Sequence, residues 1–159
     1  MKTTPPTRFY TGSGQHEHDR IAILVSRWNK QVCEKLYEAA ETVLKMQGVA
    51  RIEKIYVPGS YELPFAAQCV AKSQHFDAII CLGCILTGET KHNEYISLSV
   101  AQGIMRVALD YKLPIIFGVL TPNSQEQALE RAGGALGNKG TDSAIAALEM
   151  IDMVRTTSF

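Results

Sequence analysis

IAILVS, residues 21–26, is a short and almost continuous apolar run that decides the fold class of this chain. Such a run is typical of a strand that is buried on both faces, as the strands of parallel sheets are. Residues 30–47 then show an apolar stripe at helical spacing, and Gly48 stands where this helix is expected to end. A buried strand that leads directly into an amphipathic helix predicts an α/β protein with a parallel sheet.

The alternation of strand and helix continues along the chain. The pattern predicts further strands at residues 52–57, 78–82 and 115–120, and helices at residues 61–73, 93–112, 125–132 and 141–154. Ser124 and Gln127 fit a capping box for the third of these helices, and the glycine-rich residues 133–140 indicate a loop. We therefore predict a three-layer, doubly wound α/β sandwich. Its central sheet is mainly parallel, four-stranded and of flavodoxin-like order, with helices on both faces.

Length and composition limit the number of domains and the partners. The chain has 159 residues, enough for one compact domain, which we place at residues 20–159 after a polar arm at residues 1–19. Its 16 basic and 16 acidic residues balance and form no basic run, which argues against nucleic acid as a partner. No apolar stretch is long enough to cross a membrane, and the polar start lacks a secretory signal, so we expect a cytoplasmic protein. The charged fraction of 20% is below the usual ~25%, which suggests that another chain covers part of the surface.

The four cysteines include one C-x-x-C pair, Cys81 and Cys84, which could indicate redox chemistry or half of a zinc site. The two lie three positions apart on a predicted strand, so their side chains should point to opposite faces of the sheet. No second Cys or His pair is spaced to complete a tetrahedral site. We therefore predict free thiols and no metal site.

Ligands of doubly wound sheets bind at the carboxyl ends of the strands, and this directs attention to four segments. These are residues 26–29, 58–62, 83–92 and the stretch from 121 onwards. Residues 83–90 are one residue away from a phosphate-binding P-loop, but Glu89 stands where that loop requires lysine. A carboxylate there would repel the β- and γ-phosphates, so nucleotide hydrolysis is excluded. The backbone N–H groups of Gly88 to Thr90 could still hold a single anion, and an ordinary turn is the alternative.

Several side chains near these strand ends could carry chemistry, and each has a plainer alternative. His92 could transfer a proton or simply be a solvated histidine at the start of a helix. Trp28 could stack on a flat ring, whereas Phe117 is expected to pack in the core. Glu62 could cap its helix or bond a ligand, and Arg131 could clamp a phosphate or lie on a solvated face. The remaining histidines stand in polar surroundings and receive no role: His16, His18 and His75.

Together these segments resemble the lumazine synthase family of riboflavin biosynthesis, in collinear order from about residue 20 to residue 155. The matching stretches are Arg27–Asn29, Val57–Pro64, Leu82–Gly83, Gly88–His92, Phe117–Thr121, Glu130–Gly133 and Gly137–Gly140. Each stretch alone is a weak signal, whereas the set is specific. The chain departs from many members at Thr87, where they carry Arg or Lys, and at Asn93, where they carry an aromatic residue.

The resemblance implies a transferase that needs no cofactor. Members condense 5-amino-6-(D-ribitylamino)uracil with 3,4-dihydroxy-2-butanone 4-phosphate, releasing phosphate and water, in the penultimate step of riboflavin biosynthesis. By position, His92 is the proton-transfer residue. The uracil and ribityl pocket is implied to comprise Trp28, Ser60, Tyr61, Glu62, Cys84, Ile85, Leu86 and Phe117. The butanone phosphate is implied to bind Glu89, Thr90, Arg131 and Lys139.

The resemblance also implies a homopentamer with each active site between adjacent subunits, where the neighbour brings Phe117 and Arg131. In some members pentamers build a hollow icosahedral shell, and riboflavin synthase is a further partner. Two alternatives stay open. One is an archaeal-type riboflavin synthase, which dismutates two lumazines, and the other is a non-catalytic shell protein that binds a flavin or a lumazine. His92, Arg131 and the Gly-Asn-Lys-Gly stretch at 137–140 favour the condensing enzyme.

Overall fold

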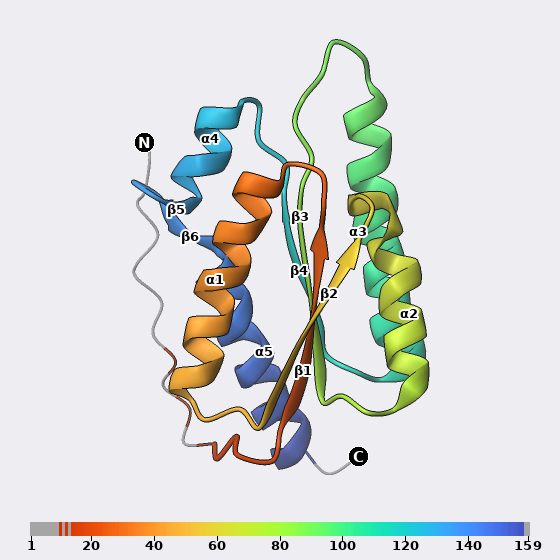
Figure 1. The fold of residues 1–159 in the computed structure, drawn as a ribbon. Coiled ribbons are helices and arrows are strands. Elements are labelled where there is room, and N and C mark those ends of the chain that lie inside the picture. Colours follow the sequence, from red (N-terminus) through yellow and green to blue (C-terminus); the bar gives the residue numbers. More distant parts are fainter. Residues whose placement is uncertain (1–9, 11, 13, 158–159) are drawn as a thin grey trace.

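Four parallel strands form the centre of the computed structural model, which describes residues 10, 12 and 14–157. They are β1 (Arg20–Ser26), β2 (Arg51–Val57), β3 (Ala78–Cys84) and β4 (Ile115–Leu120), in the order β2-β1-β3-β4 (Figure 1). Ile21 of β1 stands opposite Ile52 on one side and Ala78 on the other. The predicted parallel sheet and its flavodoxin-like order are confirmed. Most of the predicted arm, residues 1–19, lies outside the described residues.

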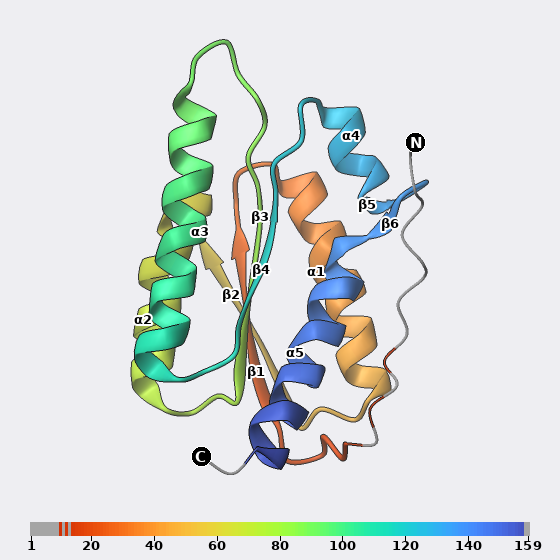
Figure 2. The ribbon, with the colours of Figure 1, turned by 180° about the vertical axis from the view of Figure 1, so that it is seen from behind.

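Helices cover both faces of the sheet, as predicted. One face carries α2 (Leu63–Ser73) and α3 (His92–Tyr111), and the other carries α1 (Lys30–Met46) and α5 (Lys139–Thr156) (Figures 1 and 2). Alternate residues of β1 supply two separate cores, because Ile21, Ile23 and Val25 pack under α1 and α5. Ala22 and Leu24 pack under α2 and α3. Since both faces are buried, the strand reads as a continuous apolar run.

The predicted end of the first helix is confirmed. Gly48 adopts a φ of 74°, a left-handed conformation that glycine reaches without steric cost. Its N–H donates to the Lys45 carbonyl at 3.0 Å, and the N–H of Val49 donates to the Leu44 carbonyl at 3.1 Å. These two bonds are the Schellman arrangement that satisfies the last carbonyls of a helix.

Two predicted boundaries were wrong at the carboxyl end of the sheet. β3 continues to Cys84, two residues beyond the predicted end, because Gly83 and Cys84 still pair with Val119 and Leu120 of β4. The helix predicted from residue 61 begins instead with a 3-10 turn, η1 (Ser60–Glu62), and α2 follows it with Pro64 in its first turn.

The glycine-rich segment was predicted as a loop, and the structure corrects this. It holds a small antiparallel hairpin, β5 (Ala132–Gly134) and β6 (Gly137–Asn138). Helix α5 then begins at Lys139, two residues before its predicted start, because Asn138 Oδ1 accepts the Gly140 N–H at 2.8 Å and caps it. A short helix, α4 (Gln125–Glu130), precedes the hairpin.

The capping box predicted for α4 is present in altered form. Ser124 Oγ accepts the Gln127 N–H at 3.3 Å, as predicted. The Gln127 side chain, however, accepts the N–H of Asn123 at 3.0 Å rather than that of Ser124. The reciprocal bond is therefore displaced by one residue.

The segment before β1 is joined to the last turns of α5 through a buried histidine. His16, to which the sequence assigned no role, is fully buried and lies 2.6 Å from the Asp19 carboxylate. Its other ring nitrogen lies 2.7 Å from the Tyr10 hydroxyl, which also donates to Asp152. Asp19 in turn accepts from the guanidinium of Arg155. Within the described part of the chain, no helix is both long enough and apolar enough to span a membrane.

Candidate active site

A cavity of about 530 Å³ opens at the carboxyl ends of β1 and β3, beside η1 and the start of α3. We call it the strand-end cavity. It is lined by Trp28, Asn29, Gly59, Ser60, Tyr61, Glu62, Cys84, Ile85, Leu86, Gly88, Thr90, His92, Asn93 and Ile96. Its position agrees with the rule that ligands of open α/β sheets bind outside the carboxyl ends of the strands.

Trp28 stands at the rim of the strand-end cavity with its ring free. Its side chain is 73% exposed, and it follows directly after β1. A Cβ placed on Gly59 would touch the indole ring at 3.5 Å, so the ring lies beside the turn that follows β2. A large exposed indole on the rim of a cavity offers a flat apolar platform for a planar ligand.

The turn after β2 presents one carboxylate and one hydroxyl to the strand-end cavity. Glu62 Oε2 accepts the Gly59 N–H at 2.9 Å, so its predicted capping role is confirmed. Ser60 is only 6% exposed, and among the described residues its hydroxyl has no hydrogen-bond partner. Buried hydroxyls without a partner are uncommon, because desolvation costs free energy that a hydrogen bond normally recovers. The Ser60 hydroxyl lies buried beside Gly83, and Ser60 itself lines the strand-end cavity.

The floor of the strand-end cavity is apolar. Cys84 is buried there, and burial raises the pKa of its thiol to about 11. Cys81 belongs to the core under α2 and α3, whereas Cys84 belongs to the core under α1 and α5, which confirms the predicted opposite faces. No group of three or more His, Cys, Asp or Glu residues in the described structure could hold a metal ion.

His92 is the first residue of α3 and lies exposed on the wall of the strand-end cavity. Its backbone N–H donates to Thr90 Oγ1 at 3.4 Å. The first N–H groups of a helix have no partner within it, so this end of α3 can also attract an anion. A histidine thus stands beside a helix start that can attract an anion.

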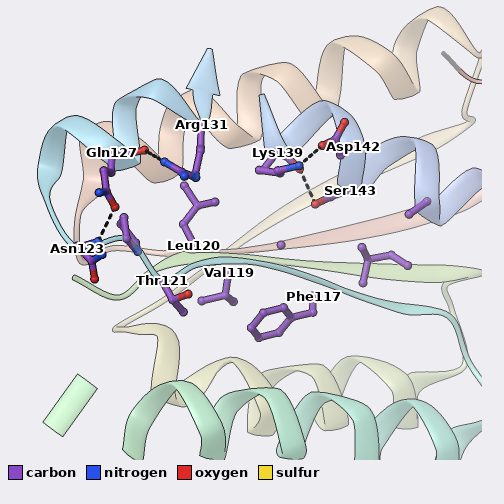
Figure 3. Close-up of a pocket in the computed structure, with 14 residues that line it drawn as sticks. Phe117, Val119, Leu120, Thr121, Asn123, Gln127, Arg131, Lys139, Asp142 and Ser143 are labelled. Atoms are coloured by element: carbon purple, nitrogen blue, oxygen red, sulfur yellow. Dashed lines mark hydrogen bonds and ion pairs between the residues drawn. The ribbon is translucent and has the colours of Figure 1, made fainter. Parts of the chain in front are cut away.

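A second cavity, of about 660 Å³, lies along β4, the edge strand of the sheet, and we call it the edge cavity (Figure 3). It is lined by residues 116–123 together with Gln127, Arg131, Lys139, Asp142, Ser143 and Ala146. Phe117 is 42% exposed here, so the prediction that it packs in the core was wrong. An edge strand has no further strand to cover its side chains, which explains the exposure.

Two cations point into the edge cavity from α4 and α5 (Figure 3). Arg131 ends α4, and its Nη1 donates to the Gln127 carbonyl at 3.0 Å. Lys139 begins α5, and its Nζ bonds Asp142 Oδ2 at 2.7 Å. Both side chains keep N–H groups that point to no described partner, so the pair can receive an anion such as phosphate.

The structure divides the site residues named from the sequence between the two cavities. The strand-end cavity receives Trp28, Ser60, Tyr61, Glu62, Cys84, Ile85, Leu86, Thr90 and His92. The edge cavity receives Phe117, Arg131 and Lys139. Glu89 lines neither, and no residue lines both. The described residues around the strand-end cavity include no Lys or Arg, so one copy of the chain does not combine the platform, the histidine and the cations.

Several lining residues were not assigned to the site from the sequence, and two of them matter most for its geometry. Asn29 lines the strand-end cavity in a left-handed conformation, which no sequence pattern signals. Asp142 pairs with Lys139, and their spacing of three residues would have indicated the pair if α5 had been predicted to begin at Lys139.

Thr87 stands at one of the two positions where the chain departs from many of the sequences that it resembles. It has a structural role, because it links the loops of the two cavities. Its Oγ1 lies 3.1 Å from Asn123 Oδ1 and 3.3 Å from the Pro122 carbonyl, and its N–H donates to the same carbonyl. Asn123 lines the edge cavity, while Thr87 precedes Gly88 of the strand-end cavity. A short hydroxyl side chain therefore joins the loop after β3 to the loop after β4.

Comparison with known proteins identifies one family. Residues 18–155 match the family model described as 6,7-dimethyl-8-ribityllumazine synthase. A protein of that name from Cytophaga hutchinsonii is 45% identical over 145 residues, covering 89% of this chain and 91% of its own. Proteins of that name from two strains of Coxiella burnetii are 46% identical over 138 residues, covering 86% of this chain and 91% of their own.

A solved structure of a GDP-L-fucose synthetase from Naegleria fowleri aligns with 86% of this chain and 44% of its own, at 13% identity. Its TM-score of 0.37 is too low to support any inference. The family match and the named relatives do not favour an archaeal-type riboflavin synthase or a non-catalytic shell protein. The chain belongs to the 6,7-dimethyl-8-ribityllumazine synthase family.

Proposed function

We propose that the strand-end cavity binds 5-amino-6-(D-ribitylamino)uracil. The observation that carries this proposal is the gathering of an exposed indole ring, a carboxylate, an unpartnered hydroxyl and a histidine in one cavity. The Trp28 ring offers a stacking surface for the pyrimidine. Glu62 and the Ser60 hydroxyl offer hydrogen bonds to the polar edge and the ribityl chain.

In the proposed reaction the 5-amine of the uracil attacks the ketone of 3,4-dihydroxy-2-butanone 4-phosphate, and loss of water gives an imine. Elimination then expels the phosphate. The ribitylamino nitrogen then attacks the ketone formed after elimination, and loss of a second water closes the second ring and gives 6,7-dimethyl-8-ribityllumazine. His92 stands at the wall of the cavity, where it would carry protons between these steps. Holding both reactants in place supplies much of the acceleration, since oriented pairs gain ~7–11 kcal/mol over a bimolecular reaction.

The phosphate of the second substrate requires cations, and these lie in the edge cavity. Arg131 and Lys139 would hold it, with the N–H groups near Thr90 as a weaker contribution. Because the two cavities share no described residue, a complete site is best supplied by two copies. The strand-end cavity of one copy would face Phe117, Arg131 and Lys139 of its neighbour.

Self-association is further supported by apolar side chains that the single chain leaves exposed. Along η1, α2 and α3 these are Tyr61, Phe65, Tyr95, Leu98, Met105 and Leu109. An apolar surface of this extent is typical of a protein interface. We propose a homopentamer, with assembly into an icosahedral shell and association with riboflavin synthase as further possibilities within the family. The four free cysteines fit a reducing compartment, and we propose the cytoplasm.

The direct test supplies the two substrates to the purified protein and follows phosphate release together with lumazine absorbance. His92→Ala should lower kcat by about 10²- to 10³-fold, within the usual contribution of general acid–base catalysis, and leave the KM for the uracil largely unchanged. His75→Ala is a matched control, because His75 is exposed and lies before β3, away from both cavities. Wild-type turnover by His92→Ala would remove the proton-transfer role.

Arg131→Ala should mainly raise the KM for the butanone phosphate, by about tenfold or more, because a charge-assisted contact to the phosphate is lost. Arg51→Ala removes a cation at the opposite end of the sheet and should leave this KM unchanged. An unchanged KM in Arg131→Ala would contradict the assignment of Arg131 to the phosphate.

A further inference from the structure

Asn29 departs from two rules of helix starts at the rim of the strand-end cavity. It is the N-cap of α1, yet its backbone is left-handed, with a φ of 56° and a ψ of 45°. An N-cap residue usually has an extended backbone, and its side chain accepts a hydrogen bond from the first turn. The Asn29 side chain makes no such bond. Non-glycine residues at positive φ are uncommon and cost free energy, and they persist where the surroundings require them.

The Asn29 side chain instead bridges two strands. Its Nδ2 donates to the Cys84 carbonyl at 2.7 Å, which ties the loop after β1 to the last residue of β3. The Asn29 carbonyl accepts the N–H groups of Val32 and Cys33 at 3.0 and 3.1 Å, so the start of α1 is fixed to the same point.

The two ends of this bridge adjoin residues that line the strand-end cavity. Trp28 directly precedes Asn29, and Ile85 and Leu86 directly follow Cys84. Few other bonds fix the Trp28 backbone: among the described residues its carbonyl accepts only long contacts, at 3.4 Å, from Ser26 Oγ and Cys33 Sγ. The neighbouring Arg27 N–H donates to the Val57 carbonyl at 2.9 Å and ties this loop to β2, while the Asn29 amide ties it to the end of β3 beside Ile85 and Leu86.

We propose that Asn29 is a positioning residue that sets the width of the slot in which the uracil ring binds. This inference rests on the proposed function of the strand-end cavity. It explains why the residue combines a left-handed backbone with a side chain directed across the sheet. Asparagine tolerates the left-handed region better than other residues with side chains, and its amide supplies the donor that a carbonyl requires.

Two substitutions separate the effect of the left-handed backbone from the effect of the hydrogen bond. Asn29→Gly keeps the left-handed backbone without cost and removes the bridge. Asn29→Asp keeps both the size and the tolerance of the left-handed region, but places a carboxylate oxygen against the Cys84 carbonyl. Gln74→Gly is the matched control, because Gln74 has the same φ of 56° at the end of α2 and lines neither cavity.

The test measures kcat, the KM for each substrate, the melting temperature and the binding of 6,7-dimethyl-8-ribityllumazine. Trp28 is the only tryptophan, so quenching of its fluorescence by added lumazine reports directly on the slot. Both Asn29 variants should raise the KM for the uracil and the Kd for lumazine by about tenfold, the usual effect of one lost hydrogen bond in a site. The KM for the butanone phosphate should stay unchanged, and so should the kinetic and binding values for Gln74→Gly.

Variants of Asn29 that fold and bind both uracil and lumazine like the wild type would overturn the proposal. A lower melting temperature without the selective change in the KM for the uracil would also overturn it, because that is the result of a merely structural role. Failure of the wild type to form lumazine would instead refute the proposed function of the cavity, so the two failures are distinguishable.

Discussion

At the scale of single residues, burial governs the reactivity of the thiols around the strand-end cavity. Cys84 forms part of its floor, and Cys33 lies on the buried face of α1. Burial raises the pKa of the Cys84 thiol to about 11 and that of Cys33 to about 12, because a thiolate is poorly solvated there. At neutral pH both thiols therefore stay protonated and serve as apolar side chains.

This state predicts the pattern of alkylation. Iodoacetamide at neutral pH should leave Cys33, Cys81 and Cys84 of the native protein unmodified, while Cys69, the exposed cysteine, reacts. Peptide mass spectrometry reads the sites directly, and Cys69→Ser provides a chain in which native labelling should nearly cease. Rapid modification of Cys84 at neutral pH would show that its thiol is ionised and available for chemistry.

A site residue could be predicted from the sequence where it stands near the end of a strand or the start of a helix. Trp28, Glu62 and His92 come directly after buried strands or at a helix start, so their gathering follows from the topology of the sheet. Asn29 could not be predicted, because its role depends on a positive φ and a bond to Cys84, neither of which leaves a pattern in the sequence.

At the scale of elements, the outer strand β2 is tied to α1 by a group of charged and aromatic side chains. Lys54 of β2 bonds Glu34 of α1 at 2.5 Å, and Tyr56 donates to the same carboxylate at 2.7 Å. The Lys54 ammonium also lies 3.9 Å from the centre of the Tyr37 ring. Burial raises the pKa of Glu34, but the bonds from Lys54 and Tyr56 outweigh it, and the pKa is lowered overall.

The lowered pKa sets the pH range in which this tie stabilises the protein. A carboxyl whose pKa is lower in the folded than in the unfolded state contributes stability above its unfolded pKa and loses it as pH falls through the folded pKa. Lys54→Met should therefore lower the free energy of unfolding by about 1 kcal/mol at neutral pH. The deficit should shrink at an acid pH below the folded pKa of Glu34, where the ion pair is lost and the contacts of Lys54 with the Tyr37 and Tyr56 rings remain.

Urea unfolding at the two pH values measures this difference. Lys45→Met is a suitable control, because Lys45 is 65% exposed and pairs with Glu41 along one helix, where such pairs contribute roughly 0.3–0.5 kcal/mol. A Lys54→Met deficit that is the same at both pH values would exclude Glu34 as its main source.

Close contact between α1 and α5 depends on Gly140. A Cβ at this position would overlap the backbone carbonyl of Leu36, which cannot move without displacing α1. Gly103 of α3 is also crowded, but by the side chain of Pro64 at 2.8 Å, which stands in the first turn of α2 and can shift with the end of that helix. Gly140→Ala should therefore destabilise by about 3 kcal/mol, whereas Gly103→Ala should cost about 1 kcal/mol, partly offset by its better helix propensity.

Thermal unfolding of the two alanine variants side by side tests this comparison. Equal melting temperatures would mean that α1 can retreat from α5, and that the approach of the two helices at Leu36 is not essential to the core.

The prediction of element boundaries succeeded where burial decides them. It failed where local backbone geometry decides them. Continuous apolar runs located β1, β3 and β4, since both faces of the sheet are covered there, while β2 was located as the segment that ends at Pro58-Gly59. The hairpin of β5 and β6 was missed because it rests on positive φ values at Gly133 and Gly137, and glycine clusters also occur in loops. Because of that error, the predicted start of α5 was two residues too late, and the ion pair of Lys139 with Asp142 was missed.

At the scale of the whole molecule, two incomplete cavities predict that activity can be restored by mixing defective subunits. His92→Ala damages only the strand-end cavity, and Arg131→Ala damages only the edge cavity. If each site joins two copies, rings that assemble at random from equal amounts contain intact pairs at about a quarter of their interfaces.

The two variants, dissociated together and allowed to reassemble, should therefore recover up to about a quarter of wild-type activity at low butanone phosphate concentration. Each variant treated alone is the control. Activity no greater than the sum of the separate variants would show that every site lies within one chain.

The bond between Asp19 and Arg155 has a consequence for synthesis on the ribosome. The two residues lie 136 positions apart, and Arg155 stands in the last turn of α5. β1 is also completed late, because its neighbour β3 begins only at Ala78 and its covering helix α5 only at Lys139. The central strand is thus translated first and enclosed last, so the nascent chain must keep an apolar segment from aggregating until the final helix emerges.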